Sequence, residues 1–161
     1  MRPAYDRLAT LDGLLRRAGE LSAKTLVFDV EPLVAHWESG QDALDQGVKS
    51  VLARTRAIPG VQVVCFSTNS ARRPSSPLAG DGVRAEYLAL AGKPLRTAPY
   101  RDFPRPGVVI GDQLATDGAL ARRLGYAFLQ YYPDQSSLPV GPRLMDWTGQ
   151  LLRPLLFARR H

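Results

Sequence analysis

The chain has 161 residues, is 45% hydrophobic, and carries a formal net charge of +6. This balance predicts one globular domain over residues 1–161, without a membrane-spanning run or an apolar leader, and the basic excess favours anionic partners. A single cysteine and two histidines exclude an internal disulfide and a cysteine–histidine metal site, and they suit a reducing cytoplasm.

The first half of the chain alternates between helical and strand-like patterns. Leu8, Leu11, Leu14 and Leu15 follow helical spacing, and Pro59-Gly60 ends a later helical stretch. The expected elements are a helix over residues 4–20, which makes 1–20 an N-terminal helical segment, a strand over 24–29, a helix over 41–56 and a strand over 61–66.

The second half is less regular. The prolines of residues 73–77 exclude a regular helix, residues 83–91 fit either a short strand or one helical turn, and 95–106 are expected to be loop. The elements expected after them are a strand over 107–110, a helix over 114–124, a strand over 126–131, and an amphipathic helix over 141–158 within a basic segment 141–161. Strands that alternate with helices predict an α/β fold, a three-layer Rossmann-like core around a mostly parallel sheet.

Three of the expected strands end in polar residues. Asp29 and Ser67 end the first two, and Gly111-Asp112 end a third, with Asp117 following where a helix begins. The carboxyl ends of parallel strands meet at one edge of the sheet, where open α/β folds bind ligands. Paired carboxylates there suit a hard cation such as Mg²⁺ beside a phosphate, whereas a single acid after a strand is more often a helix cap.

Four ordered segments resemble the haloacid dehalogenase (HAD) superfamily of phosphotransferases, and within it the YqeG-like branch that includes phosphatidylglycerophosphate phosphatases. They are Phe28-Asp29-Val30-Glu31, Phe66-Ser67-Thr68-Asn69-Ser70-Ala71-Arg72-Arg73, Gly92-Lys93-Pro94 and Gly111-Asp112-Gln113-Leu114-Ala115-Thr116-Asp117. The likeness covers residues 10–158 and implies Mg²⁺ as the cofactor.

The resemblance implies a role for each matching residue. Asp29 would be the nucleophile that forms an aspartyl-phosphate, Ser67 would hydrogen-bond the phosphoryl group, and Lys93 would offset its charge. The metal would be held by Asp29, Glu31, Asp112 and Asp117, with Glu31 contributing its carbonyl, and the substrate would contact Thr68, Asn69, Arg72 and Arg73. Each role answers a need of phosphoryl transfer, which requires alignment of the nucleophile and neutralisation of negative charge.

The first motif departs from the family pattern. Glu31 stands where the family has a second Asp, the acid and base of the reaction, and Pro32-Leu33 replaces the usual Asn-Thr. A longer side chain displaces the carboxyl group, and displacements of about 1 Å can cost about 100-fold in rate. Two outcomes stay open: a phosphatase that uses Glu31, or a weakened or inactive relative that binds a phosphate-containing ligand, another protein or nucleic acid.

The spacing of the motifs leaves no room for a large cap domain. An open site suits a large substrate, namely a lipid headgroup, a phosphoprotein or a nucleic-acid end, and the branch resemblance favours phosphatidylglycerophosphate. The basic amphipathic helix expected over 141–158 either packs on the sheet or lies on an anionic membrane, which would make the cytoplasmic protein membrane-peripheral. Trp37 is either a lid over the core or part of the site.

Overall fold

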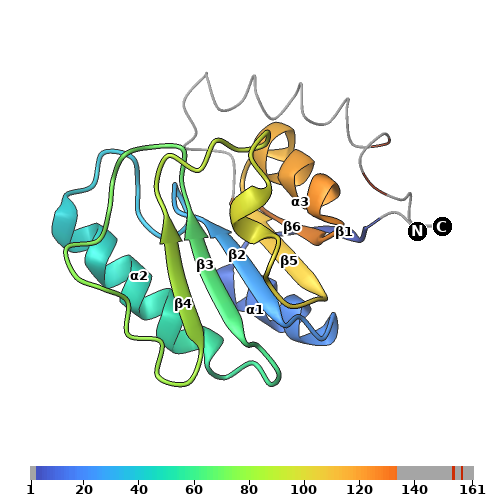
Figure 1. Ribbon diagram of the computed structural model, residues 1–161, viewed down its shortest axis with the longest axis horizontal. Coiled ribbons are helices and arrows are strands. Elements are labelled where there is room, and N and C mark those ends of the chain that lie inside the picture. Colours follow the sequence, from blue (N-terminus) through green and yellow to red (C-terminus); the bar gives the residue numbers. More distant parts are fainter. Residues whose placement is uncertain (1–2, 134–153, 155–156, 158–161) are drawn as a thin grey trace.

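The computed structural model describes residues 3–133 together with Pro154 and Phe157 (Figure 1). Six parallel strands form one sheet in the order β1-β6-β5-β2-β3-β4. The strands are β1 Tyr5–Leu8, β2 Thr25–Asp29, β3 Val63–Ser67, β4 Arg84–Leu88, β5 Gly107–Gly111 and β6 Ala127–Tyr131. The predicted α/β class with a Rossmann-like core is therefore confirmed.

The two faces of the sheet are covered by different helices. On β2, Leu26 and Phe28 pack into the cluster that holds the buried faces of α1 (Leu11–Glu20) and α2 (Gln41–Thr55). Val27 points to the opposite face, where its cluster includes residues of α3 (Ala119–Leu124). Because side chains alternate along a strand, a strand that is apolar throughout is buried on both faces, which gives three layers.

The helix expected over residues 4–20 is wrong in its first part. Residues Tyr5–Leu8 form β1, which pairs in parallel with β6, and Tyr5 lies opposite Phe128. Thr10 then begins α1, since its Oγ1 accepts a hydrogen bond of 3.1 Å from the Gly13 amide. Pairing with a strand more than 100 residues later overrides the local leucine spacing.

The remaining elements agree with the expected ones in type, with shifted ends. The ambiguous segment 83–91 contains strand β4, and the expected loop 95–106 contains a short 3-10 helix, η1 (Ala98–Tyr100). The helix expected over 114–124 begins as a π-helical turn, η2 (Leu114–Gly118), before α3. The amphipathic helix expected over 141–158 falls outside the described residues, apart from Pro154 and Phe157.

The topology defines where a ligand would bind. Strand β2 lies between β3 and β5, so the chain leaves it in one direction for β3 and returns on the other side with β5. Such a switch point opens a crevice at the carboxyl ends of the strands. Among the described residues, no cap domain stands over this edge, since residues 30–40 and 68–83 only connect core elements. None of the described helices is long and apolar enough to cross a bilayer.

Candidate functional site

A cavity of about 300 Å³ opens at the carboxyl ends of β2 and β3. Its lining comes from the loops that follow β2, β3, β4 and β5, and most of these side chains are polar. The lining residues are Asp29, Glu31, Trp37, Thr68, Asn69, Ser70, Lys93, Gln113 and Thr116. The structure therefore brings together residues from all four segments that the sequence analysis singled out.

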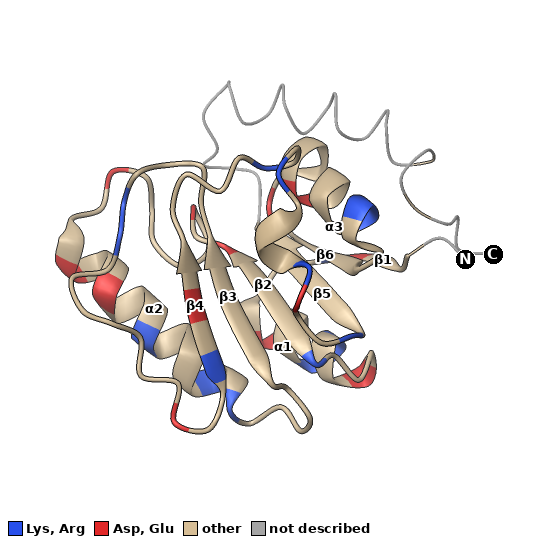
Figure 2. Cartoon of the chain, in the orientation of Figure 1, with Lys and Arg blue, Asp and Glu red and all other residues tan. Residues whose placement is uncertain are grey.

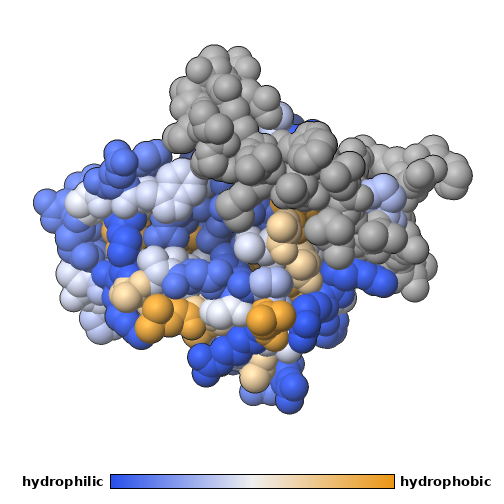
Figure 3. Space-filling view, turned by 90° about the horizontal axis from the view of Figure 1, so that it is seen from above, coloured by the Kyte–Doolittle hydropathy of each residue, from blue (hydrophilic) through white to orange (hydrophobic). Residues whose placement is uncertain are grey.

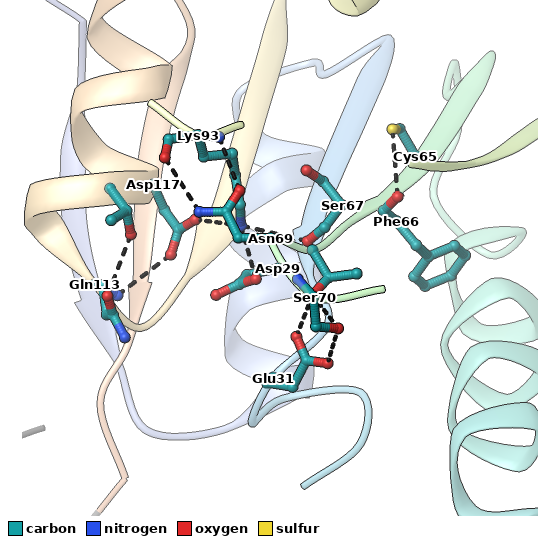
Figure 4. A network of polar contacts seen from close by, with 12 residues as sticks. Asp29, Glu31, Cys65, Phe66, Ser67, Asn69, Ser70, Lys93, Gln113 and Asp117 are labelled. Atoms are coloured by element: carbon teal, nitrogen blue, oxygen red, sulfur yellow. Dashed lines mark hydrogen bonds and ion pairs between the residues drawn. The ribbon is translucent and has the colours of Figure 1, made fainter. Parts of the chain in front are cut away.

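Lys93 joins two aspartates at the floor of the site (Figure 4). Its Nζ atom lies 2.7 Å from Asp29 Oδ1 and 2.7 Å from Asp117 Oδ1, and it also donates to the Ser67 carbonyl at 3.3 Å. All three charged side chains are shielded from water, with exposed fractions of 4% for Lys93, 12% for Asp29 and 0% for Asp117. Buried charges persist only when they are paired, as these are.

The pKa values of Asp29 and Lys93 are strongly shifted. Burial and the charge of Asp117 raise the pKa of Asp29 well above its ordinary value, against the opposing effect of Lys93. Burial alone would lower the pKa of Lys93, but the charges of Asp117 and Asp29 outweigh it, so the pKa lies above its ordinary value. Lys93 therefore stays a fixed positive charge over the range in which carboxylates titrate.

Asp117 reaches the site because of an unusual turn. The amides of Asp117 and Gly118 both donate to the Gln113 carbonyl, at 2.9 and 3.2 Å, within η2. The turn brings the Asp117 carboxylate back against the end of β5, where a Cβ on Gly111 would lie 2.4 Å from Asp117 Oδ2. Only glycine at position 111 leaves room for this carboxylate, and π-helical turns of this kind are frequent at functional sites.

Three carboxylates gather at this point in an arrangement that fits a hard cation. Asp29, Asp112 and Asp117 each offer an oxygen, and these oxygens lie within 4.8 Å of one another. Lys93 bonds to Oδ1 of Asp29 and of Asp117, and Asp117 Oδ2 accepts a hydrogen bond of 3.4 Å from the Gln113 amide. Oxygen donors from carboxylates are what Mg²⁺ and Ca²⁺ prefer, so the donor set agrees with the implied Mg²⁺. The Asp112 carbonyl is anchored by Gln130 Nε2 at 2.8 Å.

Glu31 is held by the loop that follows β3. Its Oε2 accepts a hydrogen bond of 2.7 Å from Thr68 Oγ1, and its Oε1 accepts one of 3.4 Å from Ser70. Arg72 lies 3.7 Å from the same carboxylate, which is 7% exposed. Figure 4 shows the Glu31 carboxylate turned toward Ser70. The carboxylate thus lines the cavity while also tying two loops together.

The guanidinium of Arg72 is held by hydrogen bonds within the protein. It donates to the carbonyl oxygens of His36 and Ser39, both at 2.9 Å. These bonds fasten the loop 36–39, which carries Trp37, to the loop after β3. Arg73 is exposed and lies outside the cavity lining. Of the two arginines predicted to contact substrate, one positions the site and the other lies beside it.

Asn69 and Lys93 are tied by two reciprocal bonds. The Lys93 amide donates to Asn69 Oδ1 at 2.8 Å, and Asn69 Nδ2 donates to the Lys93 carbonyl at 3.1 Å. Paired bonds of this kind fix the backbone from which the lysine side chain extends. Asn69, which the sequence analysis assigned to the substrate, therefore also positions Lys93.

Ser67 and Thr68 point to different surroundings. The Ser67 hydroxyl is buried against Tyr100, with 2.7 Å between the two oxygens, whereas the Thr68 hydroxyl donates to Glu31 Oε2 at 2.7 Å. The phosphoryl contact predicted for Ser67 stays a prediction. Burial raises the pKa of the Tyr100 hydroxyl to about 12, so the hydroxyls of Tyr100 and Ser67 both remain neutral.

Some residues of the site were not singled out from the sequence. Gln113 and Thr116 line the cavity, and their hydroxyl and amide groups lie 3.4 Å apart. Their position inside the segment 111–117 was a usable signal, because both fall between two of the clustered aspartates. Nothing in the sequence indicated that Tyr100 would partner Ser67.

Comparisons with known proteins give no family assignment. The chain matches no protein-family model, no curated protein and no solved structure. The function is therefore inferred from the geometry of the site.

Proposed function

We propose that this protein is a divalent-cation-dependent phosphoric monoester hydrolase of the HAD type. The observation that carries the proposal is the convergence of three aspartates and one buried lysine at a sheet edge, with carboxylate oxygens within 4.8 Å of one another. A negative phosphoryl group can approach such an acidic cluster only when positive charge accompanies it. Bound Mg²⁺, held by Asp29, Asp112 and Asp117, would supply that charge and orient the phosphate.

In this proposal Asp29 attacks phosphorus, and the bond from phosphorus to the leaving-group oxygen breaks. Glu31 gives a proton to the leaving alkoxide and then takes one from the water that hydrolyses the aspartyl-phosphate. Lys93 stabilises charge on Asp29 and on the phosphoryl oxygens. The products are inorganic phosphate and an alcohol.

We further propose that the substrate is large, such as the lipid phosphate phosphatidylglycerophosphate in a peripheral, cytoplasmic setting. The cavity is open, and the described part of the chain contains no domain that would close over a small metabolite. A phosphate at the end of a large substrate needs no cap, since the rest of the molecule covers the site.

The test is hydrolysis of p-nitrophenyl phosphate by the purified chain, with and without Mg²⁺. We expect turnover that requires Mg²⁺ and that Asp29→Asn abolishes, while Asp102→Asn, a change of the same type at an exposed position, leaves it intact. Because water attacks phosphorus of the aspartyl-phosphate, hydrolysis in ¹⁸O-labelled water should place the label in the inorganic phosphate and not in Asp29. Turnover that survives Asp29→Asn would refute the nucleophile, and no turnover with any ester would refute the hydrolase.

The second candidate is a non-catalytic phosphate-binding protein. The observation that favours it is the Glu31 carboxylate, which already accepts hydrogen bonds from Thr68 and Ser70 and faces Arg72. Proton transfer by Glu31 would have to compete with these contacts. Under this alternative, phosphate binds in the presence of Mg²⁺ without turnover, and Glu31→Asp restores measurable hydrolysis.

A further inference from the structure

The described residues expose three large hydrophobic side chains, which belong to the loops that follow β2 and β4. Trp37 is 40% exposed, Leu90 is 59% exposed and Leu95 is 75% exposed. Trp37 lines the cavity itself. Leu90 and Leu95 stand on either side of Lys93 along the loop that follows β4. An apolar group exposed alone is ordinary, whereas exposed groups that gather at one site indicate an interaction surface.

Backbone contacts place this loop beside the cavity. The Leu90 amide donates to the Ser70 carbonyl at 2.9 Å, and the Ala91 amide donates to the Thr68 carbonyl at 2.9 Å. Ser70 and Thr68 both line the cavity. We call Trp37, Leu90 and Leu95 the apolar rim. Figure 3 looks down on the carboxyl edge of the sheet and shows hydrophobic groups, in orange, standing among largely hydrophilic ones.

Leu90 is unfavourable in two respects, its backbone conformation and its exposure to water. Its backbone has φ of 51°, in the left-handed region that leucine rarely adopts, and most of its side chain faces water. Asparagine or glycine would hold this turn with less strain and without an exposed apolar group. Strained residues concentrate at functional sites, so a contact outside the chain is the natural role for this side chain.

The charge around the rim is positive. The loops that follow β3 and β4, residues 68–83 and 89–106, contain six basic residues and two exposed acidic ones. The basic residues are Arg72, Arg73, Lys93, Arg96, Arg101 and Arg105, and the acidic ones are Asp81 and Asp102. Arg73, Arg96 and Arg101 are exposed, while Glu38 is the exposed acid on the loop of Trp37. Figure 2 shows acidic residues, in red, on α2 and β4 as well as near the carboxyl ends of the strands. The exposed charge of the rim is therefore complementary to an anionic surface.

We propose that the apolar rim and its arginines dock the open cavity onto an anionic lipid surface. Isolated tryptophan and leucine side chains at loop tips, accompanied by arginine, are suited to the interface between headgroups and acyl chains. Each basic residue near an anionic leaflet adds to the attraction. This assigns membrane contact to the described loops. It deepens the proposed function, on which it rests for its purpose, because docking would present headgroup phosphates to Asp29.

The first experiment is co-sedimentation of the full chain with vesicles of phosphatidylcholine alone and of phosphatidylcholine mixed with phosphatidylglycerol. We expect binding to the anionic vesicles that weakens as salt is raised. The double variant L90N/L95N should lower the partition coefficient about tenfold or more, because two exposed leucines no longer enter the interface. Asparagine tolerates the backbone of residue 90, so the fold is preserved.

A matched pair of charge variants separates docking from general attraction. R73Q/R96Q removes two charges from the rim, whereas R122Q/R123Q removes two exposed charges from α3. Only the first pair should weaken binding. Equal effects of both pairs, or no binding to anionic vesicles, would overturn the proposal. Loss of a dimer in L90N/L95N, seen by analytical ultracentrifugation without any vesicle effect, would instead make the rim a protein interface and also overturn it.

The proposed function is judged separately, on the water-soluble ester p-nitrophenyl phosphate. L90N/L95N should hydrolyse this ester like the unaltered chain, because neither leucine lines the cavity. Vesicle binding without hydrolysis of any ester supports the surface and rejects the hydrolase. Hydrolysis without vesicle binding supports the hydrolase and rejects the surface.

Discussion

Replacing Gly111 by alanine should displace Asp117 and disturb the whole site. The added Cβ would lie 2.4 Å from Asp117 Oδ2, 2.6 Å from its Cγ and 2.9 Å from its Cβ. Ordinary contacts are about 3.5 to 4.0 Å, so at least one group must move by about 1 Å. Asp117 is fully buried and bonded to Lys93 at 2.7 Å, which leaves it little freedom to move.

The expected loss follows from two parts. Overpacking a buried position costs about 1–3 kcal/mol. A weakened bond between Lys93 and Asp117 adds about 1 kcal/mol, part of the value of a hydrogen bond between charged groups. We expect Gly111→Ala to lower the free energy of unfolding by about 2–4 kcal/mol, measured by urea denaturation followed by circular dichroism.

The control is an alanine where there is room. A Cβ on Gly19, inside α1, would meet only Ile58 at 3.5 Å, an ordinary contact. Gly19→Ala should therefore stabilise the protein by about 0.5–1 kcal/mol through helix propensity. In an Asp117→Gly background, Gly111→Ala should lose most of its cost, because all three close contacts are gone. A loss below about 0.5 kcal/mol, or one unchanged in that background, would refute the reasoning.

Three further predictions concern buried groups. Lys93→Met leaves Asp29 and Asp117 without the lysine ammonium group that they share, and it should lower the unfolding free energy by about 3–5 kcal/mol. In urea denaturation, added Mg²⁺ should stabilise this variant more than the unaltered chain. Equal stabilisation of the two proteins would count against the cation site. Because the pKa of Lys93 is raised, its contribution to stability is present below the ordinary value of 10.5 and falls as pH rises above it; a pH series of denaturation curves should show this decline in the unaltered chain and not in Lys93→Met. Burial raises the pKa of the Cys65 thiol, so Ellman's reagent should label the native protein only as fast as it unfolds, and rapid labelling would contradict the burial.

The central strands could be predicted because each is an apolar run that ends in a polar residue. Asp29 and Asp112 follow such runs, and topology alone then brings them to one edge. The hydrogen-bond partners of Ser67 and Thr68 could not be predicted. Consecutive residues at a strand end point to opposite sides, and β3 is buried on both faces, so its hydrophobic pattern does not indicate that Ser67 would meet Tyr100 and Thr68 would meet Glu31.

Other differences have a different origin. Leu8 continues the leucine spacing of α1 and packs against the same core cluster, yet it belongs to β1. Only pairing with β6 reveals this, and that partner lies too far along the chain for a local pattern to register. Arg72 looked like a ligand for phosphate, but its guanidinium instead holds the loop of Trp37 through carbonyl groups that carry no sequence signal.

Gln130, in β6, links β1 to the backbone of Asp112, so the support of the site is complete only after β6 has been synthesised. Tyr5 donates to Gln130 Oε1 at 2.5 Å, and Gln130 Nε2 donates to the Asp112 carbonyl at 2.8 Å. Strand β1 cannot pair, and the Asp112 backbone cannot be anchored, until β6 has been synthesised. A nascent chain that ends before β6 therefore lacks both supports. Cation affinity, measured on ribosome-bound chains of increasing length, would then report the moment at which the sheet is completed.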